Sequence, residues 1–184
     1  MGFIIEPFLL TSDLPPIVAT WRDAFAQPPS GPRSVRELTE QLHWHGTFPG
    51  FTGLVARDEH HGSVMGMVYG FSNQPGQWWR DRVAEVIGRE RTQTILTDSF
   101  CLMELGVHRA VRRQGVADAL VTALLAQQPH PRGLLSMQSD NLSALAFYRA
   151  TGWTTLIARM SFGIGFLPYD ILLRPAHTDG TESL

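Results

Sequence analysis

The residue types needed to bind an anion come together in residues 107–125, VHRAVRRQGVADALVTALL. The stretch begins as the end of an apolar strand, turns through Arg112, Arg113, Gln114 and Gly115, and continues from about Arg113 as a helix with apolar periodicity. The first turn of a helix has backbone N–H groups without partners, and its dipole is positive there. Arginines can add charge-assisted hydrogen bonds, and Gly115 and Ala117 leave the backbone open to a ligand. The stretch therefore predicts a phosphate-binding loop.

Two common phosphate-binding motifs do not fit this loop. A Walker loop needs the order GxxxxGK[ST], and the chain contains no lysine. The dinucleotide fingerprint GxGxxG is also missing. On spacing alone, an ordinary solvated helix start with two arginines explains the stretch equally well.

A second stretch, residues 141–153 with the sequence NLSALAFYRATGW, lies downstream. Together with residues 105–125, it resembles the GNAT superfamily of acetyl-CoA-dependent N-acyltransferases. The acyl-CoA motif of that family reads Arg or Gln, two residues, Gly, one residue, then Gly or Ala, and Arg112, Gly115 and Ala117 meet it. The later family pattern is an asparagine, a helix with an aromatic–Tyr pair, then Gly and an aromatic residue. Asn141, Tyr148 and the residues that follow match that pattern.

The resemblance implies a site for acetyl-CoA and no metal. The pyrophosphate would lie on backbone N–H groups of residues 113–117, and the pantetheine arm would follow the strand residues just before the loop, where that strand splays from residues 134–139. Asn141 would bond the pantetheine, and Tyr148 would protonate the departing thiolate. The cofactor-binding residues are then Leu105, Gly106, Val107, Arg112, Arg113, Gln114, Gly115, Val116, Ala117, Asn141 and Tyr148.

Glu104 is the candidate base. An alkylamine has a pKa near 10, so only about one thousandth of it is neutral at pH 7, and a base must remove a proton. Glu104 precedes Leu105 in an apolar strand, where burial would raise the pKa of a carboxylate. A structural glutamate satisfied by an arginine or by backbone groups is the alternative. Ser136, expected on the facing strand, cannot serve as a base.

The elements that must position these residues alternate between strand and helix patterns. The resemblance and the patterns together predict an α/β (α+β) fold, with a mixed, mostly antiparallel central sheet that splays at the acyl-CoA site and is flanked by helices. We expect one domain over residues 1–175 and a disordered tail over 176–184. Ser34 and Glu37 have the spacing of a capping box at the start of a helix. Residues 51–59 and 63–71 flank the sequence HHG and predict a hairpin, and Gly152 is expected to end the helix that follows Asn141.

Residues 73–99 form a connection far longer than the 2–5 residues of a hairpin. We expect an inserted helical segment there, with Trp79, Val83, Val86 and Ile87 on its apolar side. Trp78 and Trp79 would either wall the acceptor pocket or cover the core.

The composition argues against nucleic-acid-binding and membrane-spanning classes of protein. The chain has 184 residues, 43% of them hydrophobic, and a net charge of −2, so no basic field predicts nucleic acid as a partner. No apolar run reaches the roughly 20 residues of a membrane span, and the default compartment is the cytoplasm.

Cys101, the single cysteine, is expected to be buried. His43 and His45 cannot converge on one metal from a helix, and Trp44 between them is expected in the core.

The resemblance implies an N-acetyltransferase that moves an acetyl group from acetyl-CoA directly to a primary amine of a small-molecule or peptide acceptor. A homodimer is possible. The alternative is a module that binds acyl-CoA as a sensor or interaction partner without catalysis.

Overall fold

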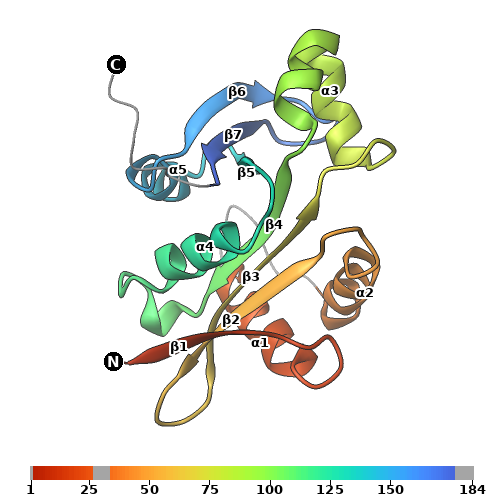
Figure 1. Cartoon of the computed structure of the whole chain (residues 1–184). Helices are drawn as coiled ribbons and strands as arrows, with labels where there is room; N and C mark the ends of the chain where they lie inside the picture. The colour runs from red at the N-terminus through yellow and green to blue at the C-terminus, as the bar shows by residue number, and fades with distance from the viewer. Residues whose placement is uncertain (1, 27–33, 177–184) are drawn as a thin grey trace. The chain divides into compact units, whose positions relative to one another are not determined.

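The structure is a computed structural model that describes residues 2–26 and 34–176 (Figure 1). The chain groups into two compact units: a first unit of residues 1–71 and 102–124, and a second unit of residues 72–101 and 125–184. Seven strands follow the order β1-β2-β3-β4-β5-β7-β6. Four of the neighbouring pairs are antiparallel and the β4–β5 pair is parallel, which confirms the predicted mixed, mostly antiparallel sheet.

The first unit holds the N-terminal strands and two helices. Its elements are β1 (Phe3–Pro7), α1 (Leu14–Ala24), α2 (Val35–His45), β2 (Thr52–Asp58), β3 (Val64–Ser72, with Ser72 itself in the second unit), most of β4 (Phe100–Val107), the short 3₁₀ turn η2 (Arg109–Val111) and most of α4 (Val116–Ala126). β2 and β3 form the predicted hairpin, and β1 adds an antiparallel strand to β2.

One apolar cluster joins α1, α2 and the strands of the first unit. Its fully buried members include Ile17, Trp21, Leu42 and Tyr69. α2 begins with the predicted capping box, since the Ser34 hydroxyl accepts from the Glu37 N–H while the Glu37 carboxylate accepts from the Ser34 N–H.

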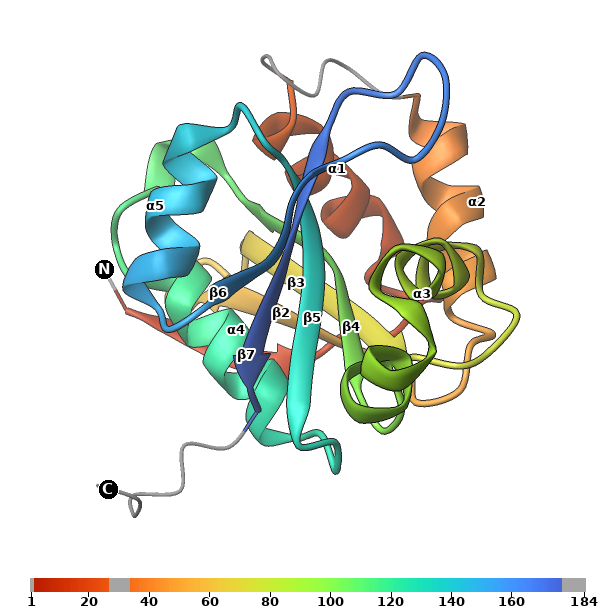
Figure 2. The ribbon, with the colours of Figure 1, turned by 90° about the horizontal axis from the view of Figure 1, so that it is seen from above.

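The second unit contains α3 (Trp78–Arg91), the π-helical turn η1 (Thr92–Leu96), the first two residues of β4, β5 (Arg132–Gln138), α5 (Leu142–Ala150), β6 (Thr154–Met160) and β7 (Tyr169–Pro175). β7 lies between β5 and β6 and is antiparallel to both, as Figure 2 shows. Val83 and Leu96 from the 73–99 segment pack with Leu134, Met160 and Ile171 in one buried cluster. The inserted segment is therefore part of the core of this unit.

Two side chains differ from the sequence-based expectation, Trp44 and Val86. Trp44 is 58% exposed, whereas His45 beside it is 4% exposed and takes the buried position. On α3, Val86 is 54% exposed, and Ala84 packs on the core cluster instead. In both helices, positions near the edge of the apolar stripe were ambiguous, and packing decided which side chain lies against the core.

Ala176 is held by a hydrogen bond from its N–H to the Pro131 carbonyl. Residues 177–184, on which most of the predicted tail falls, lie outside the described residues. Within the described ranges, no helix is long and apolar enough to cross a membrane.

Candidate functional site

The loop between β4 and α4 has an unusual backbone. β4 ends at Val107, and α4 begins at Val116, three residues later than the sequence predicted. Arg113 and Gly115 both have positive φ, 63° and 81°, with Gln114 between them at negative φ. Alternation of this kind turns successive N–H groups toward one side and creates anion-binding concavities. The helix begins later than predicted because the left-handed backbone of Arg113 interrupts helical geometry.

Gly115 occupies the N-cap position of α4. The Ala119 N–H donates to the Gly115 carbonyl at 3.0 Å, so the N–H groups of residues 116–118 precede the first intrahelical bond. A Cβ added to Gly115 would meet no atom within 4 Å. Glycine is therefore favoured by the backbone angle and not by crowding, and the free N–H groups of the helix start are open to a ligand.

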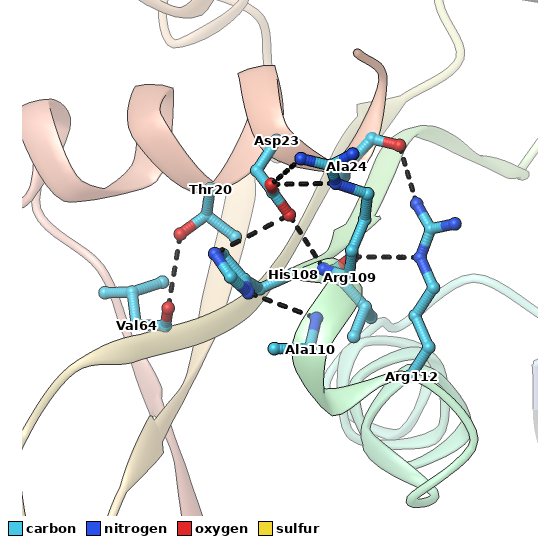
Figure 3. A network of polar contacts seen from close by, with 9 residues as sticks. Thr20, Asp23, Ala24, Val64, His108, Arg109, Ala110 and Arg112 are labelled. Atoms are coloured by element: carbon cyan, nitrogen blue, oxygen red, sulfur yellow. Dashed lines mark hydrogen bonds and ion pairs between the residues drawn. The ribbon is translucent and has the colours of Figure 1, made fainter. Parts of the chain in front are cut away.

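Arg112 holds the loop in place (Figure 3). Its Nη2 donates to the Ala24 carbonyl at the end of α1 at 2.7 Å, and its Nε donates to the Val107 carbonyl at 3.5 Å. These bonds give the guanidinium a structural role. Arg113 differs, because it is exposed and no hydrogen bond or ion pair joins its side chain to another described residue. Arg113 is thus the arginine of this loop that is available to an anion.

Asp23 on α1 fastens the same loop and was missed by the sequence reasoning. One carboxylate oxygen accepts from the Arg109 backbone N–H at 2.7 Å, and the other lies 2.9 Å from the Arg109 guanidinium (Figure 3). Burial alone would raise the pKa of Asp23, but the Arg109 hydrogen bonds and the nearby His108 and Arg109 charges outweigh it and lower the pKa. No sequence signal marks Asp23, because its partner lies 86 residues away.

The strand residues that would follow the pantetheine arm lie in β4. Leu105 and Val107 are half-buried, and Gly106 is buried, with Ala24 and Met67 beside the position that a Cβ would take. The parallel ladder of β4 with β5 pairs Phe100 with Gly133 and Cys101 with Leu134. The predicted opening between β4 and β5 depends on how the two units are placed and stays a prediction.

Glu104 belongs to a polar chain in the first unit. Its Oε1 accepts from Gln41 Nε2 of α2 at 3.2 Å. The same nitrogen lies 3.2 Å from the Tyr69 hydroxyl of β3, and this hydroxyl lies 3.0 Å from His45 Nδ1. Glu104 is half-buried, and the Gln41 amide is one of its partners. Gln41, Tyr69 and His45 were not singled out as site residues, because nothing in sequence spacing brings them to Glu104.

Asn141 and Tyr148 lie on α5 in the second unit. The Asn141 side-chain oxygen accepts from the Ala144 N–H at 3.1 Å, so the asparagine caps the helix. Tyr148 is buried, and its ring contacts Trp153 at a centroid distance of 5.7 Å. Gly152 follows the helix at a φ of 86°, as expected for a glycine C-cap. The cap and the buried ring give both candidate residues fixed positions.

The two tryptophans at the start of α3 have different surroundings. Trp79 is half-buried and packs on the core cluster of the second unit. Trp78 is 51% exposed, and its ring stacks near Phe162 and Phe166 at centroid distances of 5.3 and 6.2 Å. Of the pair, Trp78 is the residue that remains accessible to a substrate.

A Ser–His–Asp chain also occurs in the second unit. His130 Nε2 lies 2.7 Å from the Ser72 hydroxyl, and His130 Nδ1 lies 2.7 Å from the Asp98 carboxylate. Asp98 has 65% of its side chain exposed, and the backbone N–H after the serine, on Asn73, donates to the Ser99 carbonyl. A nucleophilic triad has a buried aspartate and a free oxyanion donor. These hydrogen bonds therefore have a structural role: they connect the end of β3 with the segments that lead into β4 and β5.

Cys101 is buried as expected, and burial raises the pKa of its thiol to about 12, which makes it a poor nucleophile. Among residues 2–26 and 34–176, no group of three or more His, Cys, Asp or Glu side chains is arranged to hold a metal ion.

Comparison with known proteins places this arrangement in a family. The sequence model of the Acetyltransferase (GNAT) family matches residues 18–153. A GCN5-like protein acetyltransferase of Mycobacterium tuberculosis is 31% identical over 109 residues, which are 54% of this chain and 52% of that protein. The chain thus matches about half the length of this relative.

Solved structures share the fold. The ribosomal-protein-S18-alanine N-acetyltransferase of Escherichia coli has a TM-score of 0.65 at 15% identity and covers 100% of this chain and 99% of its own. A GNAT superfamily phosphinothricin acetyltransferase of Sinorhizobium meliloti, solved in complex with acetyl-CoA, has a TM-score of 0.64 at 19% identity, covering 95% of this chain and 89% of its own. With the family match spanning most of the sequence and the loop built as described, the chain belongs to the GNAT family of acetyltransferases.

Proposed function

We propose that the protein is an acetyl-CoA-dependent N-acetyltransferase that transfers an acetyl group directly to a primary amine of a small-molecule or peptide acceptor. The observation that carries this proposal is the left-handed turn at Arg113 and Gly115, which leads into the open N-terminus of α4. Family membership and the acetyl-CoA complex of the Sinorhizobium meliloti protein support it.

The binding half of the proposal uses mainly backbone groups. N–H groups of residues 113–117 bind the pyrophosphate of acetyl-CoA, and the exposed Arg113 guanidinium adds a charge-assisted bond to a phosphate. Leu105, Gly106 and Val107 offer peptide groups to the pantetheine arm. Arg112 contributes by holding the loop to α1. The cap made by Asn141 fixes the start of α5.

The chemical half needs a neutral amine and a protonated leaving group. The bound thioester supplies an activated acetyl group. Glu104 accepts a proton from the amine, directly or through water, so that the nitrogen lone pair can attack the carbonyl. The Tyr148 hydroxyl returns a proton to the thiolate. Both reactants are held together, so no acyl-enzyme is needed.

The binding half is tested by Gly115→Glu, which adds bulk and negative charge at the anion site. Gly62→Glu is the matched control, since Gly62 also has a positive φ, 65°, and open space around its Cβ position. Both variants strain the backbone by about 1 kcal/mol. Isothermal titration should show acetyl-CoA affinity reduced by more than tenfold in Gly115→Glu and unchanged in Gly62→Glu. Equal affinities in the two variants would overturn the proposed site.

The chemical half is tested with a panel of amines and free thiol as the readout. Release of CoA thiol that depends on an amine is the expected result. Tight binding of acetyl-CoA without thiol release from any amine would instead identify the non-catalytic acyl-CoA-binding module.

A further inference from the structure

The hydrogen bonds that connect Glu104 with Gln41, Tyr69 and His45 can be assigned donors and acceptors. A carboxylate only accepts hydrogen bonds, so the amide nitrogen of Gln41, and not its oxygen, must face Glu104. The second N–H of this nitrogen then donates to the Tyr69 oxygen. The Tyr69 hydroxyl lies 3.0 Å from His45 Nδ1 and can donate to that nitrogen when it carries no proton.

The inner end of the chain can only be neutral near pH 7. His45 is 4% exposed, and desolvation by burial lowers its pKa to about 4. An unprotonated Nδ1 is the acceptor that the Tyr69 hydroxyl requires. The titratable groups joined by these hydrogen bonds are His45, Tyr69 and Glu104, and Trp21, which packs on Tyr69 from α1, does not titrate.

Aromatic packing holds the inner end rigidly. Tyr69 is fully buried, and its ring contacts Trp21 and Phe51 at centroid distances of 6.3 and 5.6 Å. The His45 ring lies 5.1 Å from the Phe71 ring. The outer end, the amide and the carboxylate, is half-buried. A fixed inner end thus determines the orientation of an amide that reaches toward solvent.

We propose that Gln41 is a positioning residue that orients Glu104 and favours its ionised form, and that Tyr69 and His45 fix the Gln41 amide. This inference rests on the proposed function, in which Glu104 accepts the proton of the amine. A donated hydrogen bond stabilises the charged form of a carboxylate and restricts its rotamers. Gln41 therefore acts through Glu104 and makes no bond to the reacting atoms.

The main variant is Gln41→Met, which keeps the length of the side chain and removes its donors. The matched control is Glu40→Gln on the same helix, whose side chain is 64% exposed. In Gln41→Met we expect kcat for acetyl transfer to fall by about tenfold, because one charge-assisted hydrogen bond is lost. KM for acetyl-CoA should stay unchanged. The acid limb of the pH–rate profile should move to higher pH, whereas Glu40→Gln should match the wild type.

Tyr69→Phe gives a second, milder perturbation, because it removes the hydroxyl and keeps the ring. It should move kcat and the acid limb in the same direction as Gln41→Met, by a smaller factor. The double variant Gln41→Met/Glu104→Gln should be no slower than Glu104→Gln alone, since residues that act as a unit have non-additive effects. A further loss in the double variant would contradict the inference.

NMR titration of the Glu104 carboxyl gives a readout that does not need turnover. Its midpoint should lie at higher pH in Gln41→Met than in the wild type. An unmoved midpoint overturns the inference whatever the activity. A moved midpoint together with full turnover in Glu104→Gln would show that Gln41 does hold Glu104 while the base assigned in the proposed function is wrong.

Discussion

Acid should destabilise the protein through His45. The histidine is neutral and buried in the fold with a pKa of about 4, while an exposed histidine has a pKa of about 6.5. The unfolded chain therefore binds a proton that the folded chain excludes between these two values. Stability is fully present above pH 6.5 and is lost as pH falls toward 4. A difference of about 2.5 pH units, at about 1.4 kcal/mol per unit, corresponds to about 3.5 kcal/mol.

The measurement is urea unfolding at closely spaced pH values between 4 and 7.5, with His45→Asn compared with the wild type. Asparagine keeps an acceptor for the Tyr69 hydroxyl but does not titrate. The two proteins are compared by the slope of the unfolding free energy against pH. Any destabilisation caused by the smaller asparagine is the same at every pH and does not change this slope. In the wild type, the contribution of His45 to this slope should approach 1.4 kcal/mol per pH unit near pH 5. The variant should lack this contribution.

His43→Asn is the control, since His43 lies on the same helix and is exposed. It should reproduce the wild-type slope. The pKa values of Asp23 and Asp58 are also lowered in the fold. Protonation of these aspartates reduces stability mainly below the pH range in which His45 acts, so the two effects can be separated. Parallel curves for the wild type and His45→Asn between pH 6.5 and 4.5 would refute the reasoning, because His45 would then titrate equally in both states.

Three further predictions concern the candidate site. Arg113→Gly removes a left-handed arginine, so it should leave stability within about 1 kcal/mol of the wild type while acetyl-CoA affinity falls by about tenfold; Arg159→Gly, at a φ of 52°, should leave affinity unchanged in the same titration. Tyr148→Phe should keep acetyl-CoA affinity and lower kcat by about 10² in the thiol assay, and an unchanged kcat would leave Tyr148 with packing alone. Trp78→Ala should change acceptor KM with little loss of stability, whereas Val86→Ala, another exposed site on α3, should change neither.

The 73–99 segment shows why a point variant is preferable to removal of the whole connection. Replacing it with a short turn would delete Val83 and Leu96, which are fully buried in the core cluster of the second unit. Loss of two such side chains costs about 4 kcal/mol or more, a large part of the stability of a domain. The exposed Trp78 can be altered without that loss.

The sequence by itself determined the features that depend on short stretches of chain. The capping box of Ser34 and Glu37, the glycine turn at Gly152 and the β2–β3 hairpin all appear as predicted, because each is formed by residues a few positions apart. The strand, turn and helix around Gly115 were also predicted, together with the family. The roles of Glu104 and of the cofactor-binding residues stay predictions.

Tertiary structure decided which side chains meet. Arg112 was expected at a phosphate, and its guanidinium bonds the Ala24 carbonyl, 88 residues away. Glu104 meets Gln41 across 63 residues. Sequence spacing carries no information about such pairs, because they form when a helix packs on a strand from another part of the chain. The left-handed backbone of Arg113 was likewise not predictable, because arginine has no intrinsic preference for that conformation, and the residue before it, Arg112, is held by the distant Ala24 carbonyl.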